Sequence, residues 1–285
     1  MNKAKKYLEK AKSENFAIGA FNAANLETIK AIVYAAKKLS SPILIECSPG
    51  EINFIGIQRA VKIVRSFEEE LEIPIILNLD HGTDPEEIKK AVDAGFDYVH
   101  FDGGKLPFEE ATKIGKELAQ YAHKKGILIE GEIDHIEGSS SDHTKEKPSV
   151  DSNLYTDPKK AKRFVEETGI DTFASFVGNL HGIYSENKHL NMDLLKEIQN
   201  AIPNTYLSLH GGSGIIEKDI TEAIKIGIVK INVNSEMRIA FKLTLQEVLD
   251  NSDEIAVYKI MEKPIEEVTK VVESKIKLFG SSNKI

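Results

Sequence analysis

The stretch IPIILNLDHGTDPEEIKKAVDAGFDYVHFDGG, residues 73–104, decides the fold. An apolar run, Ile75–Leu79, is followed by an amphipathic segment, Pro85–Ala94, and then by a second apolar run, Tyr98–Phe101. Short runs rich in Ile, Leu and Val without clean alternation are typical of parallel strands that are buried on both faces. Gly95 stands where a helix would end before the next strand. The stretch therefore predicts a strand–helix–strand unit.

The same alternation continues through the chain. Eight strands are predicted, over Ile18–Phe21, Ile43–Cys47, Ile75–Leu79, Tyr98–Phe101, Ile127–Ile129, Thr172–Val177, Tyr206–Leu209 and Val229–Val233. Helical periodicity lies between them, over Leu26–Leu39, Ile52–Leu71, Pro85–Ala94, Pro107–Lys125, Asp157–Glu167, Asn191–Ala201 and Ile216–Ile226. Eight strands, each followed by a helix, favour an α/β fold of the closed (β/α)8 TIM-barrel type. Helices at Lys3–Lys12 and Ile265–Leu278 would be added at the two ends.

No low-complexity linker divides the 285 residues, so residues 1–285 are expected to form a single barrel domain. Two segments depart from the alternation of strands and helices. Residues 134–155 form a polar connection too long for an ordinary loop and are expected to be a mobile lid. Residues 279–285 are expected to be a frayed tail.

Composition excludes several classes of protein. The formal net charge of −8 argues against nucleic acid or an anionic membrane surface as a partner. Cys47 is the single cysteine, so no intrachain disulfide can form and a reducing compartment fits best. The N-terminus lacks the apolar core of a secretory signal, and no apolar run is long enough to span a bilayer. We expect a soluble cytoplasmic protein.

Three of the eight histidines follow predicted strands: His81 follows the third, His181 the sixth and His210 the seventh. Barrel active sites lie at the carboxyl ends of the strands, so these imidazoles should converge. Three imidazoles with an open position are typical of a catalytic zinc site, whereas any one of them alone could be an ordinary hydrogen-bonded residue. Asp80, next to His81, could orient a ligand or act as a general acid/base, and we favour the second role.

Glycine-rich turns suggest phosphate binding. The run Gly211–Gly214 follows the seventh strand, and the run Asn232–Ser235 follows the eighth and opens the last helix. Backbone N–H groups in such turns bind anions, and the loops after strands seven and eight are the usual phosphate site of these barrels.

The assembled residues resemble the class II fructose-bisphosphate aldolase family, which includes the tagatose-bisphosphate aldolases. The matching stretches cover nearly the whole barrel: LDHG (79–82), HFDGGKLPFEE (100–110), EGEI (130–133), YTDPKKAKRFVEETGID (155–171), GNLHGIY (178–184), LHGGSG (209–214) and KINVNSEMRIAF (230–241).

The resemblance implies specific roles. His81, His181 and His210 would hold the catalytic zinc, and Asp80 would transfer the proton of the hydroxyl beside the cleaved bond. Asp102 and Glu132 match residues that hold a second metal position in some members. Ser48 would contact the aldehyde half of the substrate. The dihydroxyacetone phosphate half would be bound by Gly182, Gly211, Gly212, Ser213, Asn232, Val233, Asn234 and Ser235.

The implied reaction makes physical sense. Splitting a ketose between its third and fourth carbons leaves a carbanion beside a carbonyl, and a divalent metal stabilises the resulting enediolate as a Lewis acid. A lysine Schiff base is the alternative electron sink, and Lys230 near the end of strand eight is the candidate. Imidazole sites also accept cobalt, manganese or iron, so zinc is the first expectation for the native metal. A monovalent cation is a further expected cofactor.

The loop after EGEI departs from the family pattern. Its sequence is DHIEGSSSDHTKEKPS (134–149), and Ser140 falls where relatives have the acid that handles the proton at the third carbon. Glu137 or Asp142 could substitute if the loop folds differently. His100, two residues before Asp102, is interpreted as an interior barrel histidine rather than a ligand. Arg238 is the one arginine near a strand end, so a second phosphate site is poorly defined.

The first hypothesis is an aldolase that cleaves fructose 1,6-bisphosphate into dihydroxyacetone phosphate and glyceraldehyde 3-phosphate. The second keeps the chemistry but changes the sugar to tagatose 1,6-bisphosphate or another ketose 1-phosphate. A non-catalytic barrel subunit is the third, and Asp80 with its three histidines argues against it. A sugar phosphate epimerase, the fourth, would need carboxylate ligands and an acid–base pair on opposite faces. A homodimer or homotetramer is expected from the resemblance.

Overall fold

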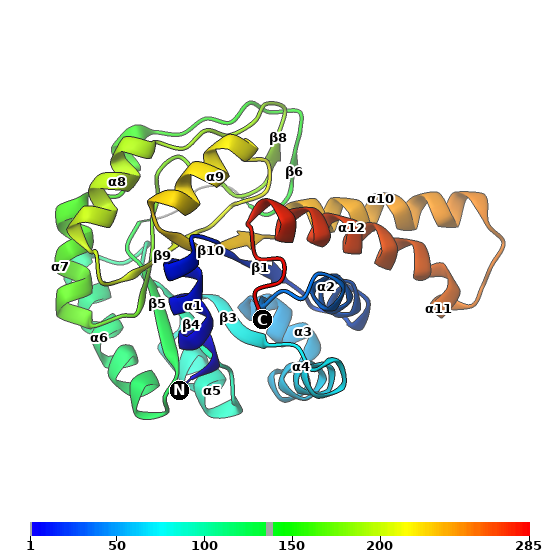
Figure 1. Cartoon of the computed structure of the whole chain (residues 1–285), viewed down its shortest axis with the longest axis horizontal. Coiled ribbons are helices and arrows are strands. Elements are labelled where there is room, and N and C mark those ends of the chain that lie inside the picture. Colours follow the sequence, from blue (N-terminus) through cyan, green and yellow to red (C-terminus); the bar gives the residue numbers. More distant parts are fainter. Residues whose placement is uncertain (1, 135–138) are drawn as a thin grey trace.

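The computed structural model describes residues 2–134 and 139–285 and contains a closed barrel of parallel strands (Figure 1). The strand order around the barrel is β1-β10-β9-β7-β5-β4-β3-β2. The bounds are β1 Ile18–Asn22, β2 Ile43–Cys47, β3 Ile75–Gly82, β4 Tyr98–Asp102, β5 Leu128–Glu132, β7 Thr172–Ala174, β9 Tyr206–Leu209 and β10 Ile228–Val233. The predicted (β/α)8 barrel is confirmed.

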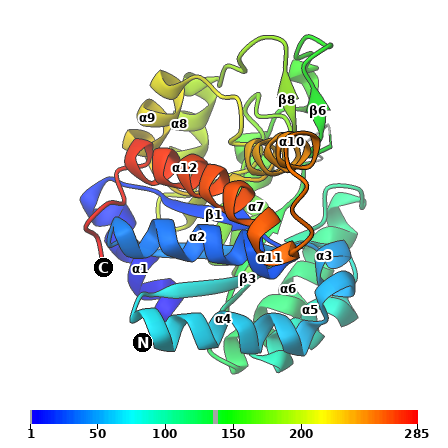
Figure 2. The ribbon, with the colours of Figure 1, turned by 90° about the vertical axis from the view of Figure 1, so that its right-hand side faces the viewer.

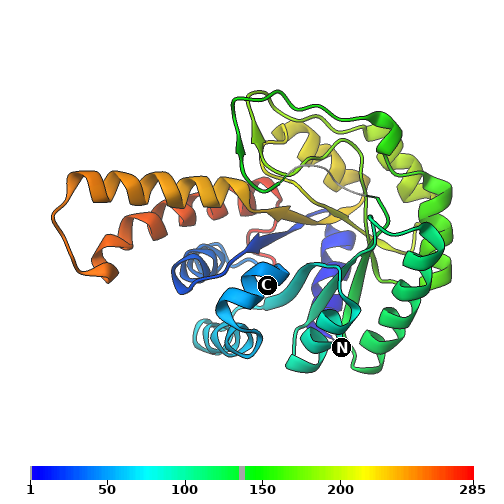
Figure 3. The same cartoon turned by 180° about the vertical axis from the view of Figure 1, so that it is seen from behind.

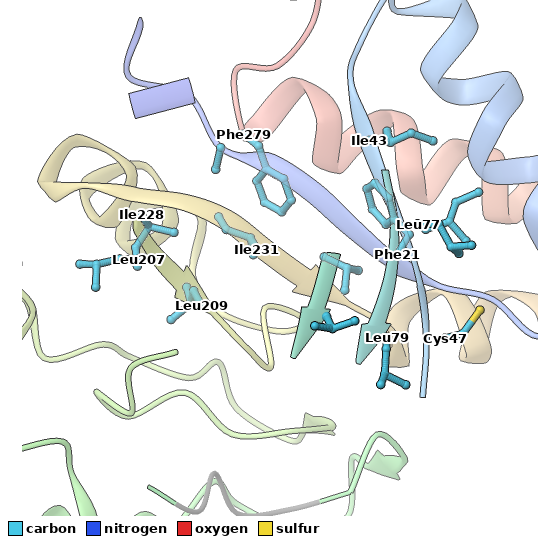
Figure 4. Close-up of a cluster of buried hydrophobic side chains, with 14 of the residues drawn as sticks. Phe21, Ile43, Cys47, Leu77, Leu79, Leu207, Leu209, Ile228, Ile231 and Phe279 are labelled. Atoms are coloured by element: carbon cyan, nitrogen blue, oxygen red, sulfur yellow. The ribbon is translucent and has the colours of Figure 1, made fainter. Parts of the chain in front are cut away.

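Helices surround the strands and bury their apolar faces against them. They are α2 Leu26–Lys38, α3 Pro49–Ile55, α4 Ile57–Leu71, α5 Pro85–Ala94, α6 Phe108–Lys124, α7 Pro158–Thr168, α8 Met192–Ala201, α9 Glu217–Ile226, α10 Ser235–Asn251, α11 Val257–Ile260 and α12 Glu262–Leu278. The main apolar core fills the space between barrel and helices, where side chains such as Phe21, Leu77 and Ile231 are fully buried (Figure 4). Among the described residues, none of these helices combines the length and the apolar character that a bilayer crossing requires.

The predicted N-terminal helix is present as α1, Lys3–Glu14, and it closes the amino end of the barrel. Its Tyr7 and Leu8 belong to a separate buried cluster with Leu44, Ile76 and Tyr98 from the strands. The lowest layer of the barrel interior is therefore apolar, which leaves the carboxyl end as the only end at which these strands present a polar site.

Helices α10, α11 and α12 form an arm that projects from the barrel (Figures 1 and 3). Figure 2 shows the arm nearly end on, with α10 pointing toward the viewer beside α12. The base of α12 packs against α2 through buried Val268, Val272 and Ile276. Sequence periodicity predicted the helix at Ile265–Leu278 but not the projection.

Two predicted elements differ from those in the structure. The single helix expected over Ile52–Leu71 is two helices, α3 and α4, because Gly56 adopts a φ of 86° that breaks the helical backbone. The sixth strand ends at Ala174 instead of Val177. Beyond it, the Val177 N–H donates to the side chain of Asn179 at 2.9 Å, so the backbone leaves the sheet pairing.

The long polar connection after β5 contains a short strand, β6 (Asp142–His143), and a single 3-10 turn, η1 (Ser152–Leu154). Strand β6 pairs with β8 (Ile183–Tyr184), which belongs to the connection after β7. These two connections therefore lie together over one side of the barrel mouth, as the top of Figure 1 shows.

The C-terminal segment is anchored, so the expectation of a frayed tail over 279–285 is wrong. Phe279 is 1% exposed and lies in the main core beside β1 and β10 (Figure 4). The Phe279 carbonyl accepts from the Ala17 N–H at 3.0 Å, and the Asn283 N–H donates to the Leu39 carbonyl at 2.9 Å. The polar composition of this segment favoured a frayed tail, whereas the buried side chain of Phe279 anchors the segment to the core.

We expect Phe279→Ala to lower the free energy of unfolding by about 3–5 kcal/mol, because it leaves a cavity in a packed core. Urea denaturation followed by circular dichroism measures the change. Ile285→Ala is the matched control in the same segment, since Ile285 is 48% exposed. Equal unfolding midpoints for the two variants would mean that the tail is not part of the core.

Candidate active site

Three imidazoles meet at the carboxyl end of the barrel. His81 lies in β3, His181 follows β7 and His210 follows β9. The ring centroids of His81 and His210 are 4.7 Å apart, those of His81 and His181 are 5.1 Å apart, and those of His181 and His210 are 6.4 Å apart. The structure thus brings the three sequence-predicted histidines to one place.

The hydrogen bonds of two of these rings define which nitrogens face each other. His210 Nε2 lies 2.6 Å from Glu130 Oε1, and His81 Nδ1 lies 3.1 Å from Asp102 Oδ2. Carboxylates only accept, so those nitrogens bear the protons. The remaining nitrogens, His210 Nδ1 and His81 Nε2, face one another across 3.0 Å. Two ring nitrogens this close need one proton or one metal ion between them.

This donor set fits a divalent metal. Two imidazole ligands of a tetrahedral zinc, with bonds of about 2.0–2.1 Å, have nitrogens roughly 3.3 Å apart, close to the observed separation. Carboxylates on the far nitrogens are the usual outer partners of metal-binding histidines. Burial opposes charge on His81, but the charge of Asp80 and the hydrogen bond to Asp102 raise the pKa of His81 to about 9. Burial lowers the pKa of His210 to about 3. His81 therefore carries the proton that His210 Nδ1 accepts, and a metal ion between the rings would take the place of that proton.

Asp102 and Glu132, the carboxylates expected at a second metal position, lie together beside His81. His81, Asp102 and Glu132 offer ligand atoms within 4.8 Å of one another. His81 Nδ1 is 3.9 Å from Glu132 Oε2, so its ring edge lies against both carboxylates.

His100 is fully buried, as expected for an interior histidine, but it touches the site. Its Nδ1 accepts from the backbone N–H of His81 at 3.1 Å, and its Nε2 lies 3.3 Å from Glu132 Oε2. His81 has a φ of 50°, a left-handed conformation that is strained for a non-glycine residue. The hydrogen bond from its N–H to His100 supports that conformation. This supporting role could not be found from the spacing of His100 and Asp102.

Asp80 is 4% exposed and held from both sides. Its Oδ2 accepts from the side-chain amide of Asn22 at 3.0 Å, and its Oδ1 accepts from that of Asn232 at 3.1 Å. Burial opposes its ionisation, but the neighbouring positive charge of His81 keeps the pKa of Asp80 well below its usual value. Asn22 was missed by sequence reasoning, although a polar residue at the end of the first strand was the available indication.

A buried ionic cluster lies beneath the histidines. Lys230 Nζ is 2.9 Å from Glu46 Oε1 and 3.0 Å from Glu130 Oε2, and all three residues are fully buried. Burial opposes its charge, but Glu130 and Glu46 raise the pKa of Lys230 above its usual value. A Schiff-base lysine must present a neutral, accessible amine. Lys230 therefore does not suit that alternative mechanism.

A pocket opens at the barrel mouth beside His81 and His181. Its lining residues are Asn22, Asp80, His81, Ser140, His181, Gly182, Gly211, Ser213, Asn232, Asn234 and Ser235. Most of the residues expected to bind the phosphate half are among them. Helix α10 begins at Ser235, which lines this pocket, so the positive end of its dipole lies at this rim.

Three of the residues expected to bind substrate, Gly212, Val233 and Ser48, are not placed as that expectation requires. The Gly212 N–H donates to the Asn232 carbonyl at 2.9 Å, so it is already used within the protein. The Val233 side chain is fully buried in the main core. Ser48 caps α3 and bonds Glu51 at 2.9 Å, and it does not line the pocket. Any contact from Val233 to a substrate would have to come from its backbone.

The loop after β5 places Ser140 in the pocket lining, at the position expected to bear an acid. The Asp142 carboxylate accepts from the Thr144 N–H at 2.9 Å and is exposed. Glu137 lies outside the described residues. Asp80 is therefore the only carboxylate among the described residues that line this pocket.

Comparisons with known proteins agree with this geometry. The family described as "Fructose-bisphosphate aldolase class-II" matches residues 2–284. A fructose-bisphosphate aldolase of Staphylococcus epidermidis is 37% identical over 98% of this chain and 97% of its own length. A sulfofructosephosphate aldolase of Alkalicoccus urumqiensis is 35% identical over 98% of this chain and 96% of its own length. The crystal structure of the YdjI aldolase from Escherichia coli K12 has a TM-score of 0.84 and 30% identity, covering 99% of this chain and 98% of that one.

The family match spans nearly every residue, and the barrel matches that of a solved aldolase over its full length. Members of this family are lyases that generally depend on a metal, in agreement with the His and Asp cluster at the barrel mouth. The chain belongs to the class-II fructose-bisphosphate aldolase family.

Proposed function

We propose that this chain is a zinc-dependent aldolase that reversibly cleaves fructose 1,6-bisphosphate into dihydroxyacetone phosphate and glyceraldehyde 3-phosphate. One observation supports the proposal above all others. His81, His181 and His210 bring their ring centroids within 6.4 Å of one another at the barrel mouth, beside the buried carboxylate of Asp80 and a glycine-rich rim. The bisphosphate named in the matching family is the first substrate to test.

The metal, once bound by the three histidines, would supply Lewis-acid stabilisation of the charge that develops at the substrate carbonyl, contributing several kcal/mol. Asp80 takes the proton of the C4 hydroxyl, and the C3–C4 bond then breaks, releasing the aldehyde. A proton delivered to C3 completes dihydroxyacetone phosphate. Asn22 and Asn232 keep both Asp80 oxygens in place during this transfer.

The phosphate of the dihydroxyacetone half would lie against Gly182, Gly211, Ser213 and the Asn234–Ser235 start of α10. Glycine is needed at 211, where φ is 61° and a Cβ would lie 2.2 Å from the Leu180 carbonyl oxygen. Backbone N–H groups and a helix N-terminus together favour a dianion at this rim.

The aldehyde half has a more open site. A second pocket adjoins the first and shares Asn22 and Asn234 with it. Arg238 lines this pocket and pairs with Glu51 at 2.8 Å. The second candidate substrate class is tagatose 1,6-bisphosphate or another ketose 1-phosphate. A ketose 1-phosphate of this kind could carry a different acidic group at the end far from the first phosphate. A relative named for a sulfonated sugar phosphate supports this alternative.

Coupled cleavage assays with fructose and tagatose 1,6-bisphosphates, with and without a chelator, test the proposal. We expect cleavage that chelator abolishes and added zinc restores, with fructose 1,6-bisphosphate giving the higher kcat/KM. Activity that survives chelator but is destroyed by borohydride with substrate would instead indicate a lysine imine. A metal-dependent enzyme that is inert toward both bisphosphates would move the proposal to another ketose 1-phosphate.

Two substitutions should separate proton transfer from metal binding. Asp80→Asn should retain equimolar zinc and lower kcat roughly 10²–10⁴-fold, the usual contribution of a general acid/base. His210→Ala should lose zinc and activity together, because the facing nitrogen is gone. Metal analysis by atomic emission beside steady-state kinetics measures both. A kcat for Asp80→Asn equal to that of the wild type would remove Asp80 from the mechanism.

We also propose that the arm mediates self-association into a homodimer or homotetramer. Large apolar side chains gather near its tip, namely Leu243, Leu249, Ile255, Val257 and Tyr258, with exposed fractions from 54% to 90%. Large exposed apolar side chains concentrated on one part of a protein are a feature of protein–protein interfaces.

The double substitution Ile255→Glu with Tyr258→Glu should produce a monomer in sedimentation velocity experiments, whereas the wild-type chain sediments as an oligomer. Each buried, unpaired carboxylate would cost an interface about 3–5 kcal/mol. Leu154→Glu, at an exposed apolar residue outside the arm, is the control and should leave the oligomer intact. A double variant that sediments like the wild type would place the interface elsewhere.

A further inference from the structure

Lys188 is a buried lysine that the proposed mechanism does not use. Its side chain is 2% exposed, and its Nζ donates to three backbone carbonyl oxygens. The distances are 2.5 Å to Leu180, 2.7 Å to Gly211 and 3.2 Å to Gly182. All three partners are neutral carbonyls that can accept but not donate, so the group at their centre must be a donor or a cation.

The three carbonyls belong to the two loops that shape the barrel mouth. Leu180 and Gly182 flank His181, and Gly211 follows His210. The main chain of Lys188 joins the same loops, because its N–H donates to the Gly214 carbonyl at 3.0 Å and its carbonyl accepts from the Ile216 N–H at 3.3 Å. One residue therefore connects the loop after β7 to the loop after β9.

The backbone is shaped to bring these oxygens together. Gly182 and Gly211 have φ values of 95° and 61°, in the left-handed region that favours glycine. A Cβ at position 211 would collide with the Leu180 oxygen, which is one of the three acceptors. Converging backbone carbonyls are also the ligands by which proteins coordinate potassium. The arrangement has the chemistry of a monovalent cation site.

We propose that the Lys188 ammonium is a built-in monovalent cation, which replaces a free potassium or sodium ion in holding together the two loops at the barrel mouth. The expected monovalent cofactor is then not required, because the chain fills the carbonyl site itself. A free ion could reach these oxygens only by displacing a side chain that is covalently held beside them.

Burying an ammonium has a cost, and burial lowers the pKa of Lys188 to about 7. The three carbonyls favour the protonated form, which offers three N–H donors, over the neutral amine, which offers two. The charge of Glu236 also raises the pKa, but Lys275, which pairs with Glu236 at 2.7 Å, lowers it. Loss of the ammonium would leave three carbonyl dipoles facing one another at the edge of the substrate pocket.

The cation site stands on the geometry of Lys188 alone, whereas its effect on catalysis rests on the proposed function. We therefore choose a test with a readout that needs no substrate. Lys188→Met keeps most of the length of the side chain and removes its charged end. Thermal unfolding of this variant and of the wild-type protein is measured in the chloride salts of potassium, sodium, ammonium and tetramethylammonium at equal ionic strength.

We expect the melting temperature of the wild-type protein to be the same in all four salts. Lys188→Met should melt several degrees lower in tetramethylammonium and should recover in potassium or ammonium, with saturation. Its kcat/KM should fall roughly 10²-fold in tetramethylammonium, because displaced loops misplace the substrate, and should rise again with the same ions. Lys196→Met, at a lysine that is half exposed on α8, should show neither effect.

A folded Lys188→Met protein that no small cation stabilises would overturn the proposal, and so would equal recovery in tetramethylammonium. If the variant does not fold, the wild-type enzyme still decides the question. Stimulation of wild-type activity by potassium or sodium over tetramethylammonium would show that a free ion is needed and that Lys188 does not replace it. Should the chain cleave neither bisphosphate, the unfolding measurements alone test the site.

Discussion

The ion pairs of Lys230 with Glu46 and Glu130 lie at the centre of the barrel, and the candidate site is built on top of them. Charges this deeply buried are tolerated only when each is paired and hydrogen-bonded. Glu130 meets that condition with four donors, since Tyr98, Ser208, His210 and Lys230 all approach its oxygens within 3.0 Å. One of those donors is His210, so the cluster that satisfies the buried charge also orients a proposed metal ligand.

The barrel interior is layered along the strands, because successive residues of a strand point alternately into the barrel and toward the surrounding helices. Interior positions two residues apart run from the apolar base through the ionic layer to the polar mouth, as in Ile76, Asn78 and Asp80 on β3. The same two-residue spacing places Leu128, Glu130 and Glu132 of β5 in these three layers. A single change of register would exchange these side chains with the core-facing ones and remove both layers at once.

Positive charge at the mouth comes from more than one source. Lys188 holds the two loops beside His181 and His210 through their carbonyls, and α10 points its N-terminus at the same rim. The facing nitrogens of His81 and His210 leave a further position for a divalent ion. These features place positive charge where backbone carbonyl oxygens and imidazole nitrogens converge. An anionic sugar phosphate fits such a rim, in agreement with the aldolase family to which the chain belongs.

From the sequence by itself, the barrel and the identity of the converging histidines and Asp80 could be predicted, because buried parallel strands and strand-end polar residues depend on local pattern. Other features needed the tertiary structure. Gly56 divides a helix through its backbone conformation, Phe279 anchors a polar tail, and the three carbonyls around Lys188 come from loops about thirty residues apart. Local periodicity cannot report contacts between distant segments, since these form only when the barrel closes and fixes which loops become neighbours.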